Sequence, residues 1–294
     1  MLALAWGACG APEPPPPPEI AWVEIVDEPL PPPEPIWPEP GARLSPPQPA
    51  YSRGFGVRKV YLDAGHGSAG SHGNTGCRCQ LEEVEVLREA VAVAEVLTET
   101  GHFEVRVSRE GSSRRSYSRR RAEAAAWGAE ALVSLHTDVR MVELGTEWEP
   151  EPGKTCPRLD GEAGFAVLWS DEGTEELVQD RHALARAVGR RLWETGFPGY
   201  PGFAWSPVYE ADALVTGVYV DRHAPGRRLY MLRRPTMPSV IVETHHAWYL
   251  AEVERWDEPA TVRAFGLALA AALVDVLPPV PPGTALADAH PPTP

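Results

Sequence analysis

The 294-residue sequence contains no uninterrupted apolar run of the length, about 18 residues, that a helix needs to cross a membrane. It therefore predicts no membrane-spanning helix. Positive charge is also scarce, because 27 Lys and Arg stand against 41 Asp and Glu and give a formal net charge of −14. Such a balance argues against a nucleic-acid partner. The basic cluster of Arg114, Arg115 and residues 119–121 is too local to reverse this, and we interpret it as a helix face.

Cysteine is rare as well, with four in the whole chain. Cys77 and Cys79 are too close in sequence to bridge each other readily. In an oxidising compartment we expect one of them to pair with Cys156 and the other to stay free. An alternative is a metal site formed by Cys77, Cys79 and a nearby His, although the spacing departs from the usual Cys-x-x-Cys.

Proline is the residue in excess, and its distribution divides the chain. Sixteen of the 33 prolines lie in the first 50 residues, and seven more follow Leu277. Residues 11–53 cannot bury enough apolar surface to fold, so we expect an extended, polyproline-like linker that rises about 3 Å per residue. A single folded domain is predicted over residues 54–278, followed by a proline-rich tail at 279–294.

The first ten residues resemble the end of a bacterial lipoprotein signal, because small residues directly precede Cys9. The pattern is incomplete, since no basic segment comes first, the apolar run is short and Trp6 stands where Leu is preferred. A lipid anchor on Cys9, followed by the linker, would tether the folded domain to a membrane.

Strand and helix patterns alternate along the predicted domain. This alternation predicts the α/β class, with a twisted, mainly parallel sheet and helices on both faces. No internal repeat appears. The predicted strands are 57–63, 103–108, 131–136, 164–169, 215–220, 229–232 and 239–243, and the predicted helices are 82–99, 118–127, 181–194 and 261–276.

Helical periodicity predicts which faces of these helices are buried. The residues predicted to face inward are Val84, Leu87, Val91 and Ala94 in the first helix, Leu184, Val188 and Leu192 in the third, and Val262, Phe265, Leu269 and Leu273 in the last.

The acidic stretch from Arg140 to Cys156 shows no helical periodicity, and we interpret it as a surface loop near the mouth of the site.

Histidines and acids stand where predicted strands end and where a helix begins. His66 lies in a Gly-His-Gly turn after the first strand, and the glycines allow a sharp turn that exposes the imidazole. Glu82 and Glu83 open the first helix, and His136 ends an apolar strand. The carboxyl ends of neighbouring parallel strands meet at one edge of a sheet, so these side chains are expected to converge. Two His and one Glu with an open fourth position suit a catalytic Zn²⁺ ion.

Several sequence blocks follow one another in an order shared with a known family. They are Leu-Asp-Ala-Gly-His-Gly ending at Gly67, the acidic helix start at Glu82, Arg120, Ser-Leu-His-Thr-Asp ending at Asp138, and Pro-Ser-Val-Ile-Val-Glu-Thr ending at Thr244. Over about residues 57–276 the chain resembles the zinc-dependent N-acetylmuramoyl-L-alanine amidases of the type-3 catalytic family. The resemblance implies a zinc enzyme that cleaves the amide between N-acetylmuramic acid and L-alanine in peptidoglycan.

The resemblance also implies roles for single residues. His66, Glu82 and His136 would be the zinc ligands, with Glu82 chosen because the family's glutamate stands five residues before a helix leucine, here Leu87. Glu83, where the family usually has Lys, stays open as a substitute ligand.

The strand ending at Glu243 supplies the remaining catalytic group. Glu243 would be the general base that takes a proton from the attacking water and delivers one to the departing amine. Arg120 would contact substrate or form a structural ion pair. His245 and His246 would line or fill the pocket.

The resemblance also bears on where the protein acts and on which alternative functions are weighed. An enzyme of this kind would act in the cell envelope, in the periplasm or at the outer surface, with the N-terminal segment as its tether. Whether an activator protein is needed is left open. A catalytically silent wall-binding or regulatory module is one alternative, although all four key positions are filled; a zinc peptidase acting on another amide is a second.

Overall fold

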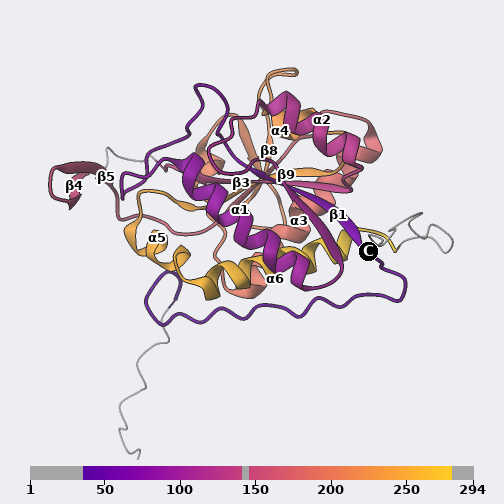
Figure 1. Ribbon diagram of the computed structural model, residues 1–294, viewed down its shortest axis with the longest axis horizontal. Coiled ribbons are helices and arrows are strands. Elements are labelled where there is room, and N and C mark those ends of the chain that lie inside the picture. The colour runs from indigo at the N-terminus through magenta and orange to yellow at the C-terminus, as the bar shows by residue number, and fades with distance from the viewer. Residues whose placement is uncertain (1–35, 141–145, 280–294) are drawn as a thin grey trace, which may run out of the picture. The chain divides into compact units, whose positions relative to one another are not determined.

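The computed structural model describes residues 36–140 and 146–279. Its main element is a seven-stranded sheet whose strands are, in spatial order, β2 (Phe103–Val107), β1 (Arg58–Ala64), β3 (Ala131–Asp138), β9 (Ser239–His246), β6 (Ala166–Trp169), β8 (Val218–Asp221) and β7 (Tyr209–Ala211) (Figure 1). Neighbouring strands from β2 to β9 are parallel, as are β6 and β8. Strand β6 is antiparallel to β9, and β7 to β8. The sheet is mixed and mainly parallel, which confirms the predicted α/β class.

Helices cover both faces of this sheet, as predicted. One apolar core joins the sheet to α1 (Glu82–Glu99), α3 (Glu175–Thr195) and α6 (Pro259–Val276). A smaller core on the other face joins it to α2 (Tyr117–Trp127) and α4 (Tyr230–Arg233). The remaining helices are α5 (Leu250–Trp256) and the short 3-10 helix η1 (Gly202–Trp205).

Helix α3 begins six residues before the predicted start. The Thr174 hydroxyl accepts a hydrogen bond from the Leu177 backbone N–H, which caps the helix, and Gly196 ends it with a positive φ of 110°. The predicted inward residues Leu184, Val188 and Leu192 are buried. The four residues predicted to face inward in α6 are buried too.

Helix α6 is long and apolar enough to cross a membrane by length and composition, with a mean hydropathy of 1.5. The contacts of α6 inside the protein account for its apolar composition without a membrane. It packs against both α1 and α3, and Phe265, Leu269 and Leu273 are almost completely buried there. We therefore interpret α6 as the central helix of the apolar core.

The predicted inward face of α1 is correct in part, because Leu87 and Ala94 pack against the core but Val84 and Val91 do not. Val84 and Val91 are exposed by 56% and 44%, whereas Val86, Ala90 and Val93 are completely buried. The helix is rotated because its inner face also carries buried carboxylates, described below, which a search for apolar periodicity counts as outward-facing.

Two further expectations need correction. The predicted strand at 229–232 is instead the single helical turn α4. The stretch predicted as a loop contains a β-hairpin of β4 (Thr146–Glu151) and β5 (Lys154–Arg158), which pair antiparallel. A disulfide joins Cys79 to Cys156 and the Trp148 indole donates to the Cys77 carbonyl oxygen at 2.6 Å, so both bonds hold the hairpin on the domain.

This pairing decides between the two expectations for the cysteines. Cys79 is oxidised and Cys77 is free and buried. One cysteine of the pair thus bridges to Cys156 as expected, and the bridge removes Cys79 from the alternative metal site.

The last part of the predicted linker, residues 36–53, packs on the domain. The Trp37 indole donates to Glu252 at 3.1 Å, and the Arg255 guanidinium donates to the carbonyl oxygens of Glu39 and Ala42. Tyr51 stacks on His102 with ring centroids 3.7 Å apart. This part of the segment is therefore a strap along the domain, where the sequence predicted a free spacer.

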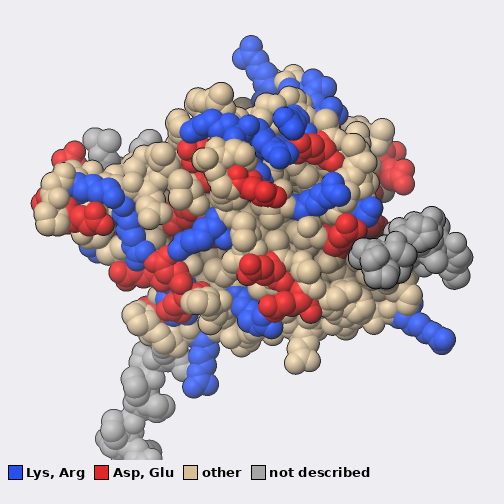
Figure 2. Space-filling view, viewed as in Figure 1, with Lys and Arg blue, Asp and Glu red and all other residues tan. Residues whose placement is uncertain are grey.

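The basic cluster near α2 is largely neutralised. Arg114 pairs with Glu83, Arg115 and Arg119 both pair with Glu123, and Arg120 pairs with Asp63. On the face drawn in Figure 2, basic and acidic side chains are interspersed.

Candidate metal centre and active site

Three side chains meet at the carboxyl edge of the sheet. His66 follows the end of β1, His136 lies near the end of β3, and Glu82 is the first residue of α1. Since β1 and β3 are neighbouring parallel strands, the two histidines leave the sheet side by side. Their ring centroids are 4.8 Å apart. We call His66, Glu82 and His136 the open cluster.

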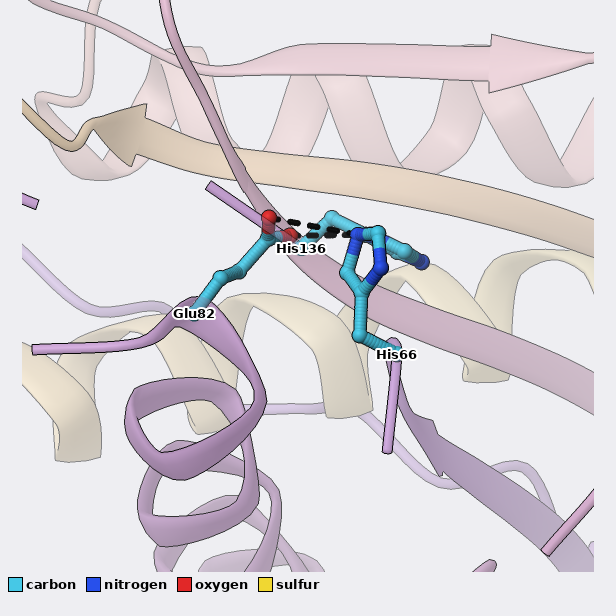
Figure 3. A group of neighbouring side chains, drawn as sticks. All are labelled: His66, Glu82 and His136. Carbon is cyan, nitrogen blue, oxygen red and sulfur yellow. Dashed lines mark hydrogen bonds and ion pairs between the residues drawn. The ribbon is translucent and has the colours of Figure 1, made fainter. Parts of the chain in front are cut away.

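Figure 3 shows that the Glu82 carboxylate bridges the two imidazoles. Its Oε2 lies 3.2 Å from Nε2 of His66, and its Oε1 lies 3.0 Å from Nδ1 of His136. Each of the three residues offers a ligand atom within 4.8 Å of the others. The donor set and its spacing fit a divalent metal ion such as Zn²⁺.

Hydrogen bonds hold the Glu82 carboxylate in this position. Asn74 donates to Oε2 from both its backbone and its side-chain amide, at 3.0 and 2.9 Å, and the Thr137 backbone N–H donates to Oε1 at 3.1 Å. Burial opposes ionisation of Glu82, but the hydrogen bonds from His136 and His66 lower its pKa well below the usual range. The carboxylate is therefore charged and oriented, as a metal ligand must be.

The backbone around His66 leaves room for both imidazoles. His66 itself has a φ of 57°, and its Nδ1 lies 3.0 Å from the Ser71 hydroxyl, which in turn contacts the Tyr117 hydroxyl. A Cβ atom at Gly65 would lie 2.5 Å from the His136 ring. Glycine at this position is thus a requirement of the close approach of His136.

Glu243 lines the same pocket as the two histidines. This pocket has a volume of about 290 Å³, and no hydrogen-bond partner contacts Oε2 of Glu243 in the described structure. Burial, and then the negative charges of Asp138 and Glu82, raise the pKa of Glu243 well above its usual range. A carboxyl group with a raised pKa beside possible metal ligands is suited to proton transfer. The other lining residues are Tyr117, Tyr209, Leu229, Tyr230, Met231 and Ile241.

Arg120 holds the end of β1 and the turn that carries His66. Its guanidinium is completely buried and donates to Asp63 and to the Ala64 carbonyl oxygen, both at 2.9 Å, and also to the His66 carbonyl oxygen. All of these partners belong to β1 and the turn after it. Of the two expectations for Arg120, the contacts support the structural ion pair.

Two other residues singled out in the sequence lie elsewhere. Glu83 binds His72 at 2.8 Å and Arg114 at 3.3 Å and, among the described residues, is not grouped with the two histidines as a possible metal ligand. His245 is completely buried against α1 and does not line the pocket that holds Glu243. The described structure thus places His245 in the core against α1, where it could support the site without lining the pocket.

Sequence reasoning missed the residues that orient the ligands. Asn74, Ser71 and Tyr117 lie in loops or at a helix start, and no motif distinguishes them from ordinary loop residues. Tyr209 lines the pocket from β7, a three-residue strand that was not predicted. Only the polar loop between the first strand and the first helix could have suggested hydrogen-bonding partners for Glu82.

Comparison with known proteins agrees with this fold and this constellation. Residues 60–275 match the Amidase_3 family model, described as N-acetylmuramoyl-L-alanine amidase. The amidase Ami1 from Mycobacterium smegmatis is 17% identical with a TM-score of 0.56, over 76% of this chain and 98% of that one. Ami1 from Mycobacterium abscessus is 16% identical with a TM-score of 0.54, over 76% and 100%. The amidase from Clostridium difficile 630 is 16% identical with a TM-score of 0.53, over 74% and 95%. The curated proteins include no match.

The sheet carries at its edge a cluster of residues that could hold a metal ion. At such low identities the solved structures show a shared fold, whereas the family model covers more than half of the chain. The chain belongs to the N-acetylmuramoyl-L-alanine amidase family, and it is a peptidoglycan amidase.

Proposed function

We propose that the chain hydrolyses the amide between N-acetylmuramic acid and L-alanine, with Zn²⁺ held by His66, Glu82 and His136 and with Glu243 as general base. The observation that carries the proposal is the convergence of the open cluster at a pocket that also holds an unpartnered carboxyl group. When bound, Zn²⁺ would polarise the amide carbonyl and lower the pKa of a water molecule to roughly 7.

The protein's own groups prepare this chemistry. The hydrogen bond between Ser71 and Nδ1 of His66 favours one orientation of that ring and leaves Nε2 directed at Glu82. Asn74 and Thr137 restrain the Glu82 carboxylate, so little rearrangement is needed to bind an ion.

Glu243 is placed to move the proton. Its free Oε2 accepts a proton from the attacking water and returns one to the departing amine. Positive charge held at the open cluster favours the carboxylate form of Glu243, because it opposes the effect of Asp138 and Glu82 on the pKa. The apolar side chains of Met231 and Ile241 line the same pocket beside this group.

Digestion of purified muropeptides tests which bond is cut. We expect mass analysis to find a free L-alanine amino group on the stem peptide together with an intact disaccharide. Products cut within the stem peptide would assign the chain to the zinc peptidases instead. Wild-type protein treated with a chelator, and the same protein with Zn²⁺ restored, provide the matched pair for metal dependence.

The enzyme acts outside the cytoplasm, where peptidoglycan lies. The Cys79–Cys156 disulfide is consistent with an oxidising compartment. Membrane attachment through Cys9 belongs to the proposal, and Cys9 lies outside the described residues. Wild-type protein should fractionate with membranes and Cys9→Ser should not; soluble wild-type protein with an unmodified Cys9 would exclude the anchor and leave the amidase function unaffected.

A further inference from the structure

A second group of acids and a histidine lies one helical turn beyond Glu82. Glu85 and Glu89 are four residues apart on α1, and His245 faces them from β9. Their ligand atoms all lie within 4.8 Å of one another, and all three residues are buried. We call Glu85, Glu89 and His245 the closed cluster, and nothing in the proposed reaction uses it.

A shift in strand pairing brings His245 to this side of the sheet. His136 of β3 is opposite Glu243, but Asp138 is opposite His246, so both Thr244 and His245 stand opposite Thr137. Such an extra residue, a β-bulge, redirects a side chain that regular alternation would place on the other face. The bulge thus turns the His245 imidazole toward the carboxyl groups of Glu85 and Glu89.

Polar atoms of the closed cluster lack partners in the described structure. Nε2 of His245 and Oε1 of Glu89 form no hydrogen bond, although the residues are 0% and 1% exposed. Nε2 of His245 points toward Oε1 of Glu85, 3.9 Å away, which is too long for a hydrogen bond. Buried polar atoms are almost always satisfied, so two unpartnered atoms in one cluster are available to bind a ligand.

The surroundings of His245 match those of a metal-binding imidazole. Its Nδ1 lies 3.0 Å from the Thr244 hydroxyl, which can accept the Nδ1 proton and leave the lone pair on Nε2 for a metal ion. Burial lowers the pKa of His245 to about 3, so the ring is neutral, as a ligand must be. Thr244 is also close enough to donate to Glu89, at 3.2 Å.

We propose that Glu85, Glu89 and His245 bind a second divalent transition-metal ion, which joins α1 to β9 beneath the active site. Two carboxylates and one imidazole suit ions such as Zn²⁺ and Mn²⁺. Burial raises the pKa of both Glu85 and Glu89, and a bound cation would oppose this shift by favouring their carboxylate forms.

A neighbouring cavity reaches Glu85, at the edge of the closed cluster. This cavity has a volume of about 280 Å³ and is lined by Glu85 together with Cys77, Arg88 and Asp257. It is separate from the pocket lined by Glu243, because the two share no lining residue. A water molecule from the cavity could complete the coordination of the ion.

The test isolates the second site by emptying the first. Full-length His136→Ala lacks a ligand of the open cluster and should still bind one equivalent of Co²⁺, measured by visible absorption and calorimetry. Adding Glu89→Gln, which keeps the side chain's size, should weaken that binding by at least about 100-fold, since it removes a direct ligand. Glu85→Gln in the same background provides a second variant if Glu89→Gln fails to fold.

His246→Gln in the same background is the matched control. His246 is also completely buried with an unpartnered Nε2, but no carboxylate pairs with its ring in the described structure. It should leave the binding of one Co²⁺ unchanged. Because Trp256 stacks on His245 with ring centroids 5.3 Å apart, bound Co²⁺ should also quench tryptophan fluorescence in the control but not in the Glu89 variant.

Two results would overturn this proposal. One is a His136→Ala protein that binds no Co²⁺ at millimolar concentration, which would make the closed cluster a set of neutral, protonated acids. The other is binding that Glu89→Gln and Glu85→Gln leave unchanged. Neither result affects the amidase proposal, which depends on the open cluster and is tested by muropeptide cleavage.

Discussion

One helix supplies carboxylates to two clusters in different environments, the open cluster with two His and one Glu and the closed cluster with two Glu and one His. In the open cluster, every Glu82 oxygen has a hydrogen bond and the His66 side chain is 24% exposed at a pocket. In the closed cluster, His245 and Glu89 are sealed from solvent and keep unpartnered atoms. Residue type alone therefore does not assign a role, because access for substrate and a nearby proton acceptor distinguish a reactive site from a structural one.

The largest expected effect separates two adjacent glutamates at the start of α1. Glu82→Ala should empty the open cluster and reduce turnover by at least about 10³-fold, because the metal supplies several kcal/mol of transition-state stabilisation. Glu83→Ala removes only the pairing with His72 and Arg114, so metal and turnover should remain. Metal analysis and muropeptide assays check both; the reverse pattern would move the ligand to Glu83.

A smaller effect is expected from the residue that orients Glu82. Asn74→Ala removes one of the hydrogen bonds to Oε2 and should weaken metal binding at the open cluster by about 10- to 100-fold. Metal binding at the closed cluster should not change. Competition with a chromophoric chelator measures both affinities, and equal weakening at both sites would show a general loss of structure instead.

The smallest effect concerns the cation beside the closed cluster. Arg88 lies 3.9 Å from Glu85, with its side chain 54% exposed, and its charge competes with a bound metal ion. Arg88→Gln in the His136→Ala background should tighten Co²⁺ binding by about two- to five-fold, the range for an exposed ion pair. Arg263→Gln, which removes an exposed pair with Glu99, is the control and should change nothing.

Much of the fold was predictable because it depends on local sequence patterns. The apolar runs that became β1, β3 and β9 lead into His66, His136 and Glu243, and parallel pairing brings those ends together. The contacts of Arg120 were not predictable, since they depend on the path of the turn after β1.

Three features could not be predicted from the sequence: the buried face of α1, the bulge in β9 and the choice of cysteine for the disulfide. Glu85 and Glu89 occupy the inner face of α1 and rotate it away from Val84 and Val91. The bulge at His245 lies beyond the predicted strand, which ends at Glu243, so the strand pattern could not reveal it. The choice of Cys79 over Cys77 for the disulfide likewise depends on the chain path, not on spacing.

The central claim is that the open cluster holds the reactive metal and that Glu243 moves the proton. The direct measurement compares the rate of muropeptide cleavage by wild type and Glu243→Gln at equal, measured zinc content. We expect the variant to fold, to keep its zinc and to lose about 10²- to 10⁴-fold in rate, because the amide has the size of the carboxylate but cannot accept the proton. Cleavage at the wild-type rate would contradict this claim and leave Glu243 a structural residue.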